Sequence, residues 1–317
     1  MYFAYSKNHP IVLLLTPIIV IGYLLALAFV LPHNQLIEVD LGWFGNYQMS
    51  YWVSLALNAL TICVNSILIN WVFNRFEFYD RNTYVPSLVY ISLISFFDST
   101  LNFNGATLAQ TFLLFALFTI YSLNQQDDGR KKAYNIGFFT SIAICLVPTY
   151  FPLGIFSFIM LWTFRPIIGK EFLLMIAGLL TPLVYMFYIS LYQQQIHLQD
   201  TYIQLNENIY LTVEKYLPIA VSAVGLLFAF AGFRSRLQKA TVRHRRLFRV
   251  QYLLILLGVF YLGVDLMFNG QFQTSVLIII PLTLGLSLAA TNNKLNRFTL
   301  PLLYIILLLT FYKFFGV

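Results

Sequence analysis

The sequence predicts an all-α fold: a transmembrane helix bundle of about eleven spans, with the N-terminus in the cytoplasm and the C-terminus outside. The bundle is expected to form a single domain over residues 1–317. Hydrophobic residues make up 59% of the chain and charged residues only 10%, whereas soluble domains contain about 25% charged residues. Because this small number of charges cannot cover a surface that faces water, most of the surface is expected to face lipid.

Apolar runs recur along the whole chain, and a transmembrane helix needs about 20 such residues. The first run, 11–31, is longer than a signal-peptide core of about 7–15 residues, so we expect a retained span. The other long runs are 51–73, 107–123, 172–192, 217–233, 250–268, 275–290 and 299–315. Three runs are shorter: 84–97, 134–148 and 150–164. Because the backbone must satisfy its own hydrogen bonds in lipid, we expect every run to be helical.

The basic residues alternate with these runs. With the N-terminus inside, all Lys and Arg residues except Lys215 and Lys313 fall in cytoplasmic segments, which is the positive-inside bias of membrane proteins. This bias also explains the net charge of +7, so no nucleic-acid partner is expected. Removing both helices of 134–164 would preserve the alternation, so this region is either two spans or a re-entrant hairpin.

Acidic residues gather on the opposite, outer side. Glu38 and Asp40 lie in the first outer loop, and Asp98 directly follows the run 84–97. Residues two apart share a face on a strand but not on a helix. Carboxylates at a membrane surface can hold a divalent cation or act as a general base, so these three are candidate catalytic residues. A solvated loop, or a helix cap at Asp98, is the alternative.

Three further polar residues near this face are candidates for substrate binding. Asn102 and Asn104 follow Asp98 closely, and Asp265 lies one turn from the outer end of its span. Ionisable groups inside spans are costly and often functional. The alternative for Asp265 is a buried pair with an Asn or Tyr on a neighbouring helix.

Amides and basic residues provide two more hypotheses. Asn58 and Asn65 share a helical face and either join helices through hydrogen bonds or line a polar path.

The basic loop 234–249 contains no acid and is expected to contact anionic lipid, at about 1 kcal/mol per residue. Its candidate lipid-binding residues are Arg243, Arg245, Arg246 and Arg249. Docking of a cytoplasmic protein or of a phosphate-bearing ligand is the alternative. The outer amphipathic segment 193–216 is either a surface helix or a lid.

Other signals are absent. The sequence has no phosphate-binding glycine loop, no zinc-protease motif and no hydrolase elbow. Cys63 and Cys145 lie in apolar runs without partners at ligand spacing. Apart from a divalent cation at the outer acids, no metal or cofactor is predicted.

The stretch 134–192 carries a resemblance to a known family. It contains a glycine-bearing helix, a proline break, and then a series of polar and helix-perturbing residues: Arg165, Lys170, Glu171, Gly178 and Pro182. This pattern resembles an uncharacterised polytopic membrane family of Bacteroidota, which implies a multi-pass protein of the bacterial inner membrane.

A more distant similarity is to membrane glycosyltransferases of the C type. Those enzymes take sugars from polyprenyl-phosphate carriers at the outer face and place an acidic residue in each of the first two outer loops. Glu38 or Asp40 would match the first acid and Asp98 the second. This sequence departs from those enzymes in two ways: its first outer loop is short, and it has no soluble outer domain. A related protein that has lost catalysis would look similar.

Three functions therefore remain open. The first is a lipid-carrier-dependent, glycosyltransferase-like protein of envelope polysaccharide assembly, with an outward-facing acidic site. The second is a transporter or flippase with a path lined by Asn58, Asn65 and Asp265. The third is a non-catalytic membrane subunit of an envelope complex, with a protein partner docked on 234–249 or on the outer segment 193–216.

Overall fold

The computed structural model describes residues 36–97, 100, 102–124, 128–166, 168–192, 213–238, 240–269, 274–292 and 295–315, with residues 17, 18, 20 and 22. The predicted first span, 11–31, and most of the segment 193–216 lie outside these residues.

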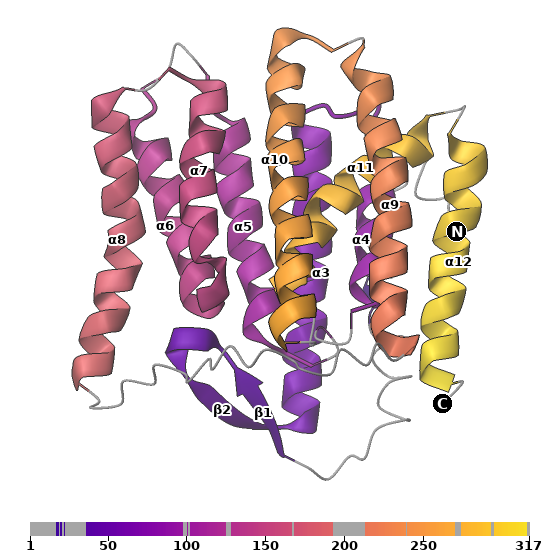
Figure 1. Cartoon of the computed structure of the whole chain (residues 1–317), viewed down its shortest axis with the longest axis horizontal. Helices are drawn as coiled ribbons and strands as arrows, with labels where there is room; N and C mark the ends of the chain where they lie inside the picture. The colour runs from indigo at the N-terminus through magenta and orange to yellow at the C-terminus, as the bar shows by residue number, and fades with distance from the viewer. Residues whose placement is uncertain are drawn as a thin grey trace.

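The described part of the chain is a bundle of helices that run side by side (Figure 1). Its helices are α3 Tyr51–Arg75, α4 Val85–Ile94, α5 Gly105–Tyr121, α6 Arg130–Leu146, α7 Phe151–Phe164, α8 Gly169–Tyr192, α9 Val213–Leu237, α10 Val242–Val264, α11 Ile279–Thr291 and α12 Asn296–Phe315. Within the described residues, five helical segments are long and apolar enough to cross a membrane: Tyr51–Arg75, Gly169–Ile189, Ile219–Leu237, Val242–Met267 and Thr274–Thr291. The prediction of apolar helices is confirmed for these regions.

The region 134–164 forms two separate helices, α6 and α7, joined by the short 3-10 helix Pro148–Tyr150. Pro148 and Pro152 both stand at the starts of helical segments, where their fixed φ and missing N–H are tolerated. Both helices lie between α5 and α8 in the bundle (Figure 1).

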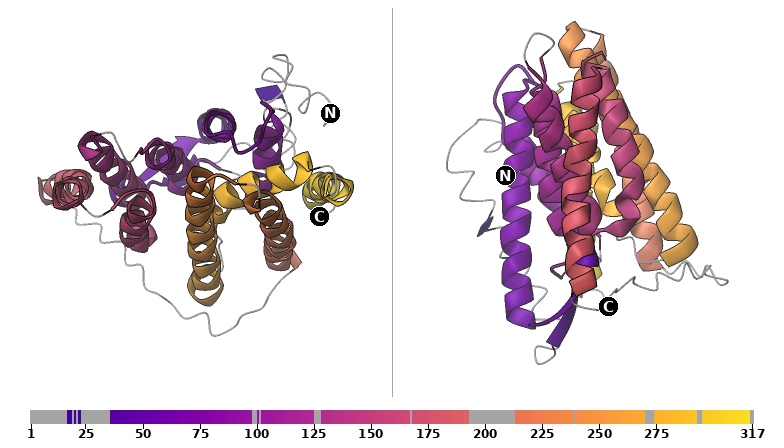
Figure 2. Two further views of the ribbon diagram at one scale, coloured as in Figure 1. Left: turned by 90° about the horizontal axis from the view of Figure 1, so that it is seen from above. Right: turned by 90° about the vertical axis from the view of Figure 1, so that its left-hand side faces the viewer.

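Helix α11 lies at the centre of the bundle and α8 at its edge (Figure 2). Every residue of α11 from Ile279 to Ala290 is buried. In α8, the buried positions follow one helical stripe: Glu171, Met175, Gly178, Pro182 and Met186. The rest of α8 exposes large apolar side chains, as a face in contact with lipid would.

Two helix pairs pack backbone against backbone. In α6 and α8, a Cβ added at Gly137 would overlap the carbonyl oxygen of Met175, and one at Gly178 would overlap that of Tyr134. In α9 and α11, a Cβ at Gly232 would lie 2.5 Å from the carbonyl oxygen of Gly285. Small residues of this kind allow close approach of helices in membranes.

A small antiparallel hairpin precedes the bundle and was not predicted as a separate element. Its strands are β1 Leu36–Asp40 and β2 Asn46–Ser50, with Leu36 opposite Ser50 and Asp40 opposite Asn46. The turn between them contains Gly42 and Gly45, with φ of 63° and 98°, which side chains disfavour. The hairpin lies at the end of the bundle where α3 begins (Figure 1).

Candidate functional site

Glu38 and Asp40 lie on the strand β1, so of the two conformations considered from their spacing the structure has the strand, on which they share a face. The Glu38 carboxylate accepts a hydrogen bond from Asn46 Nδ2 at 2.9 Å, across the hairpin. The Asp40 carboxylate accepts one from the backbone N–H of Gly42 at 2.8 Å and so fixes the turn. Val39 between them points to the other face and is fully buried. Both carboxylates therefore hold the hairpin together.

The hairpin turn sits against the ends of α5 and α6. A Cβ at Gly42 would lie 2.5 Å from the carbonyl oxygen of Leu146 and 2.6 Å from that of Cys145. A Cβ at Gly105 would overlap the same Leu146 carbonyl and would lie 3.2 Å from the carbonyl oxygen of Asp40. The backbones meet so closely that only glycine fits at either position.

The predicted binding residues before α5 have mixed outcomes. Asn104 caps α5, because its Oδ1 accepts a hydrogen bond from the backbone N–H of Thr107 at 2.8 Å. Asn102 is half-buried in the connection just before it. Asp98 lies outside the described residues. Since Gly105 follows Asn104 directly and approaches Asp40, the structure brings Asp40 and Asn104 to one corner of the molecule.

Asp265 is fully buried and bonded to nearby groups of its own chain. Its carboxylate accepts hydrogen bonds from the hydroxyl of Thr274 and, at 2.7 Å, from the backbone N–H of Ser275. These residues begin the 3-10 helix Thr274–Ile278, which continues as α11, so the carboxyl group faces the N-terminus of a helical segment. The expected partner, an Asn or Tyr of another helix, is replaced by a local hydroxyl and amide.

The amides of α3 join helices. Asn58 Nδ2 donates to the carbonyl oxygen of Thr100 at 2.8 Å, and Asn65 Nδ2 to that of Thr107 at 3.0 Å. Thr111 Oγ1 donates to Asn65 Oδ1 at 2.7 Å. This confirms the prediction that these amides hold the bundle together through hydrogen bonds.

The basic loop divides into residues with protein partners and exposed residues. Arg236 Nη1 forms an ion pair with Asp80 Oδ2 at 2.8 Å, and Arg246 Nη1 donates to the carbonyl oxygen of Phe164 at 3.0 Å. The exposed arginines on the first turns of α10 are Arg243, Arg245 and Arg249. Three of the four predicted lipid-binding arginines are thus accessible, whereas Arg246 fastens α10 to the end of α7.

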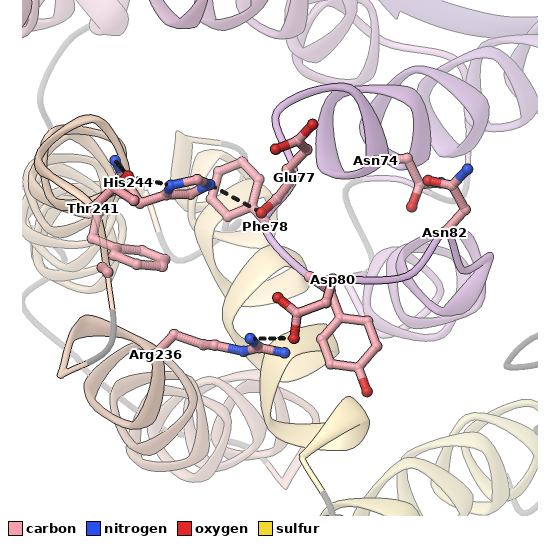
Figure 3. Close-up of a pocket in the computed structure, with 11 residues that line it drawn as sticks. Asn74, Glu77, Phe78, Asp80, Asn82, Arg236, Thr241 and His244 are labelled. Atoms are coloured by element: carbon pink, nitrogen blue, oxygen red, sulfur yellow. Dashed lines mark hydrogen bonds and ion pairs between the residues drawn. The ribbon is translucent and has the colours of Figure 1, made fainter.

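The structure also has a polar cavity that was not predicted from the sequence. A cavity of about 550 Å³ opens between the α3–α4 connection and the α9–α10 connection (Figure 3). Its polar lining residues are Asn74, Glu77, Asp80, Asn82, Arg236, Thr241 and His244. The signal in the sequence was the presence of Glu77 and Asp80, two acids in a loop that the predicted topology places in the cytoplasm with Arg75 and Arg81.

Hydrogen bonds tie the two walls of this cavity together. His244 Nε2 lies 3.1 Å from the carbonyl oxygen of Glu77, and His244 Nδ1 lies 2.8 Å from Thr241 Oγ1 (Figure 3). The Arg236 guanidinium also lies over the ring of Tyr79, 4.6 Å from its centroid. The cavity is therefore polar, carries both signs of charge and has fixed walls.

The described residues also include the usual ligands of a metal ion. Among the residues that the structure describes, no three His, Cys, Asp or Glu side chains come together as metal ligands. A divalent cation at the outer acids remains a prediction.

Packed apolar helices with the length of membrane spans, and a lipid-compatible outer surface, define a polytopic α-helical membrane protein. The chain belongs to DUF6427, a family of unknown function, whose profile matches residues 35–317. No curated protein and no solved structure matches the chain significantly.

Proposed function

We propose that the protein is a multi-pass protein of the bacterial inner membrane that acts as a non-catalytic subunit of a cell-envelope complex. The proposed topology has about eleven spans and a cytoplasmic N-terminus, and it is supported by the apolar runs and by the distribution of Lys and Arg. Several helix ends at one end of the bundle, opposite the hairpin, carry basic residues (Figure 1). Examples are the ends at Arg75, Arg130 and Arg236. This arrangement supports a cytoplasmic position for the basic end.

One observation carries the proposal: the described side chains that would perform catalysis or transport are engaged in holding the fold. Glu38 and Asp40 stabilise the hairpin, Asp265 stabilises the start of α11, and Asn58 and Asn65 join α3 to its neighbours. Glu38 is exposed, but the other four groups are half-buried or buried, so a substrate would have to displace the bonds that hold the fold. The exposed basic loop 234–249 is then the surface on which lipid and a protein partner are expected.

A glycosyltransferase-like function is the second candidate. Its specific support is that the Asp40 turn and the start of α5 meet at the hairpin end of the bundle, where the resemblance expects acidic residues from two loops. In that case a polyprenyl-phosphate carrier, with or without a divalent cation, would bind beside Asp40 and Asp98.

Mass spectrometry of the protein extracted from its own membrane separates the two candidates. The full-length chain is isolated with its lipids by a mild polymer extraction, alongside Asp40→Asn and Asp98→Asn variants. A subunit is expected to retain ordinary phospholipid and one protein in fixed ratio, unchanged in both variants. A polyprenyl-phosphate carrier that is retained by the wild type and lost from either variant would overturn the proposal in favour of the enzyme.

A further inference from the structure

The cavity between the α3–α4 and α9–α10 connections has the size and position of a ligand site. Its volume of about 550 Å³ falls within the range of small-molecule sites, about 300–1,000 Å³. Its walls come from the ends of two long apolar helices, α3 and α9, and from the first turn of α10. The ends of apolar spans lie at the level of lipid headgroups. A ligand here would therefore meet the boundary between membrane and water.

The two walls carry opposite charges. Arg236 provides the positive charge, held in place by Asp80 and by the ring of Tyr79. Glu77 and Asp80 provide the negative charge from the facing connection (Figure 3). The Asp80 side chain is 80% exposed, so its carboxylate has room for a second partner. The carboxylate of Glu77 is exposed and makes no hydrogen bond or ion pair with the described residues.

We propose that this cavity binds the phosphoethanolamine headgroup of a phospholipid, with the phosphate at Arg236 and the primary ammonium at Glu77. A purely anionic headgroup would face two carboxylates, and a purely cationic ligand would face the guanidinium. A ligand that carries both charges complements both walls. A primary ammonium also donates hydrogen bonds to carboxylates, whereas the quaternary ammonium of choline has no N–H to donate.

The backbone at Glu77 supports a site that is formed in advance. Glu77 has a φ of 53°, the only positive φ of a non-glycine residue among those described. Its carbonyl is held by His244, which is itself held by Thr241, the residue that caps α10. Strained backbone of this kind persists where the surroundings fix it and is concentrated at functional sites. The acidic wall is thereby fixed relative to α10.

Apolar side chains beside the charged groups favour a lipid as the source of the headgroup. Phe78, Phe248 and Ala240 line the cavity together with the polar residues. Val242, which follows the lining residue Thr241 at the start of α10, is 66% exposed. Phe78 and Phe248 are already buried, so the apolar surface that remains is that of half-buried Ala240 and exposed Val242. An acyl glycerol would cover this surface, and a free phosphoethanolamine compound would leave it in water.

Lipid retention by the full-length protein tests the proposal. The delipidated protein is exchanged into nanodiscs of equal parts phosphatidylethanolamine, phosphatidylcholine and phosphatidylglycerol, extracted in mild detergent, and its bound lipids are counted by native mass spectrometry. The wild type is expected to retain phosphatidylethanolamine above the other two. Glu77→Gln and Arg236→Gln should each lower that retention about 1.5-fold to fivefold, the scale of one partly exposed charge contact.

A matched control is available at the same end of the bundle. Asp128 and Arg130 form an exposed ion pair at 3.7 Å and do not line the cavity. Asp128→Asn and Arg130→Gln should leave retention unchanged, and thermal unfolding of each variant verifies that it is folded. Equal retention of the three lipids by the wild type would overturn the proposal. An equal fall in the control variants would overturn it as well.

A last measurement distinguishes the two sources of the phosphoethanolamine group. Soluble glycerophosphoethanolamine is titrated against the bound lipid. Displacement of the lipid only at a large excess supports a phospholipid as the ligand. Displacement at equimolar concentration would overturn the lipid assignment in favour of a soluble carrier of the same group.

Discussion

Replacing Gly178 by alanine should separate α6 from α8 and destabilise the bundle. An added Cβ would overlap the carbonyl oxygen of Tyr134 and lie 3.0 Å from the backbone nitrogen of Phe138. Both of these atoms belong to the backbone, so no side-chain rotation can relieve the overlap. Gly137 on α6 makes the reciprocal approach to Met175 on α8, so the whole contact must open.

The magnitude follows from a comparison of two glycines. Alanine is more favourable than glycine in a helix by about 1 kcal/mol, and overpacking costs about 1–3 kcal/mol. Gly225 lies in the middle of α9, where an added Cβ would be 3.5 Å from Leu282 Cδ2, an ordinary contact. The helix preference is shared by Gly178→Ala and Gly225→Ala and cancels between them. The first variant should therefore be less stable than the second by about 1–3 kcal/mol.

Unfolding in mixed micelles measures this difference. Each variant is titrated with SDS from a mild detergent, and far-UV circular dichroism and tyrosine fluorescence follow the transition. We expect the midpoint of Gly178→Ala to fall below that of the wild type or to match it, and that of Gly225→Ala to match or exceed it. If Gly178→Ala proves as stable as Gly225→Ala, the close approach of α6 and α8 is wrong.

Three further predictions use the same titration. Glu171→Ala should destabilise by about 3–5 kcal/mol, because it removes a carboxylate that lies 3.2 Å from Arg165, whose side chain is only 6% exposed; an effect below about 1 kcal/mol would place this pair in water. Asp80→Asn should change stability by less than about 1 kcal/mol, since its pair with Arg236 is largely exposed, and a larger loss would mean that the cavity wall depends on it. Asp265→Ala should destabilise by about 1–3 kcal/mol through the buried donors that it leaves unpaired, and a neutral result would refute its role at the start of α11.

The sequence predicted the apolar core of each span better than its ends. The run 51–73 corresponds closely to α3, whereas the run 250–268 corresponds to a helix that begins at Val242. Hydropathy detects the part of a helix that lies in lipid. The first two turns of α10 are rich in arginine and extend into the headgroup layer, so they are helical without being apolar.

Neither the hairpin nor the long-range pairing was predicted. The spacing of Glu38 and Asp40 left strand and helix open, and only the structure shows that they share a strand face. The cavity near Arg236 was invisible, because its ion pair joins residues 156 positions apart. A single sequence carries no information on which loops meet, and two acids in a basic loop gave only a local hint.

The hydrogen bonds of Asn58 and Asn65 have a consequence for how the protein is made. Each amide of α3 has its acceptor 42 residues later in the chain, so each acceptor follows its donor into the membrane. An unpaired amide in hydrocarbon costs roughly 4 kcal/mol or more relative to water. Helix α3 is therefore favoured to stay beside the insertion machinery until α5 follows. Helices α3, α4 and α5 would then enter the bilayer as one unit, not one at a time.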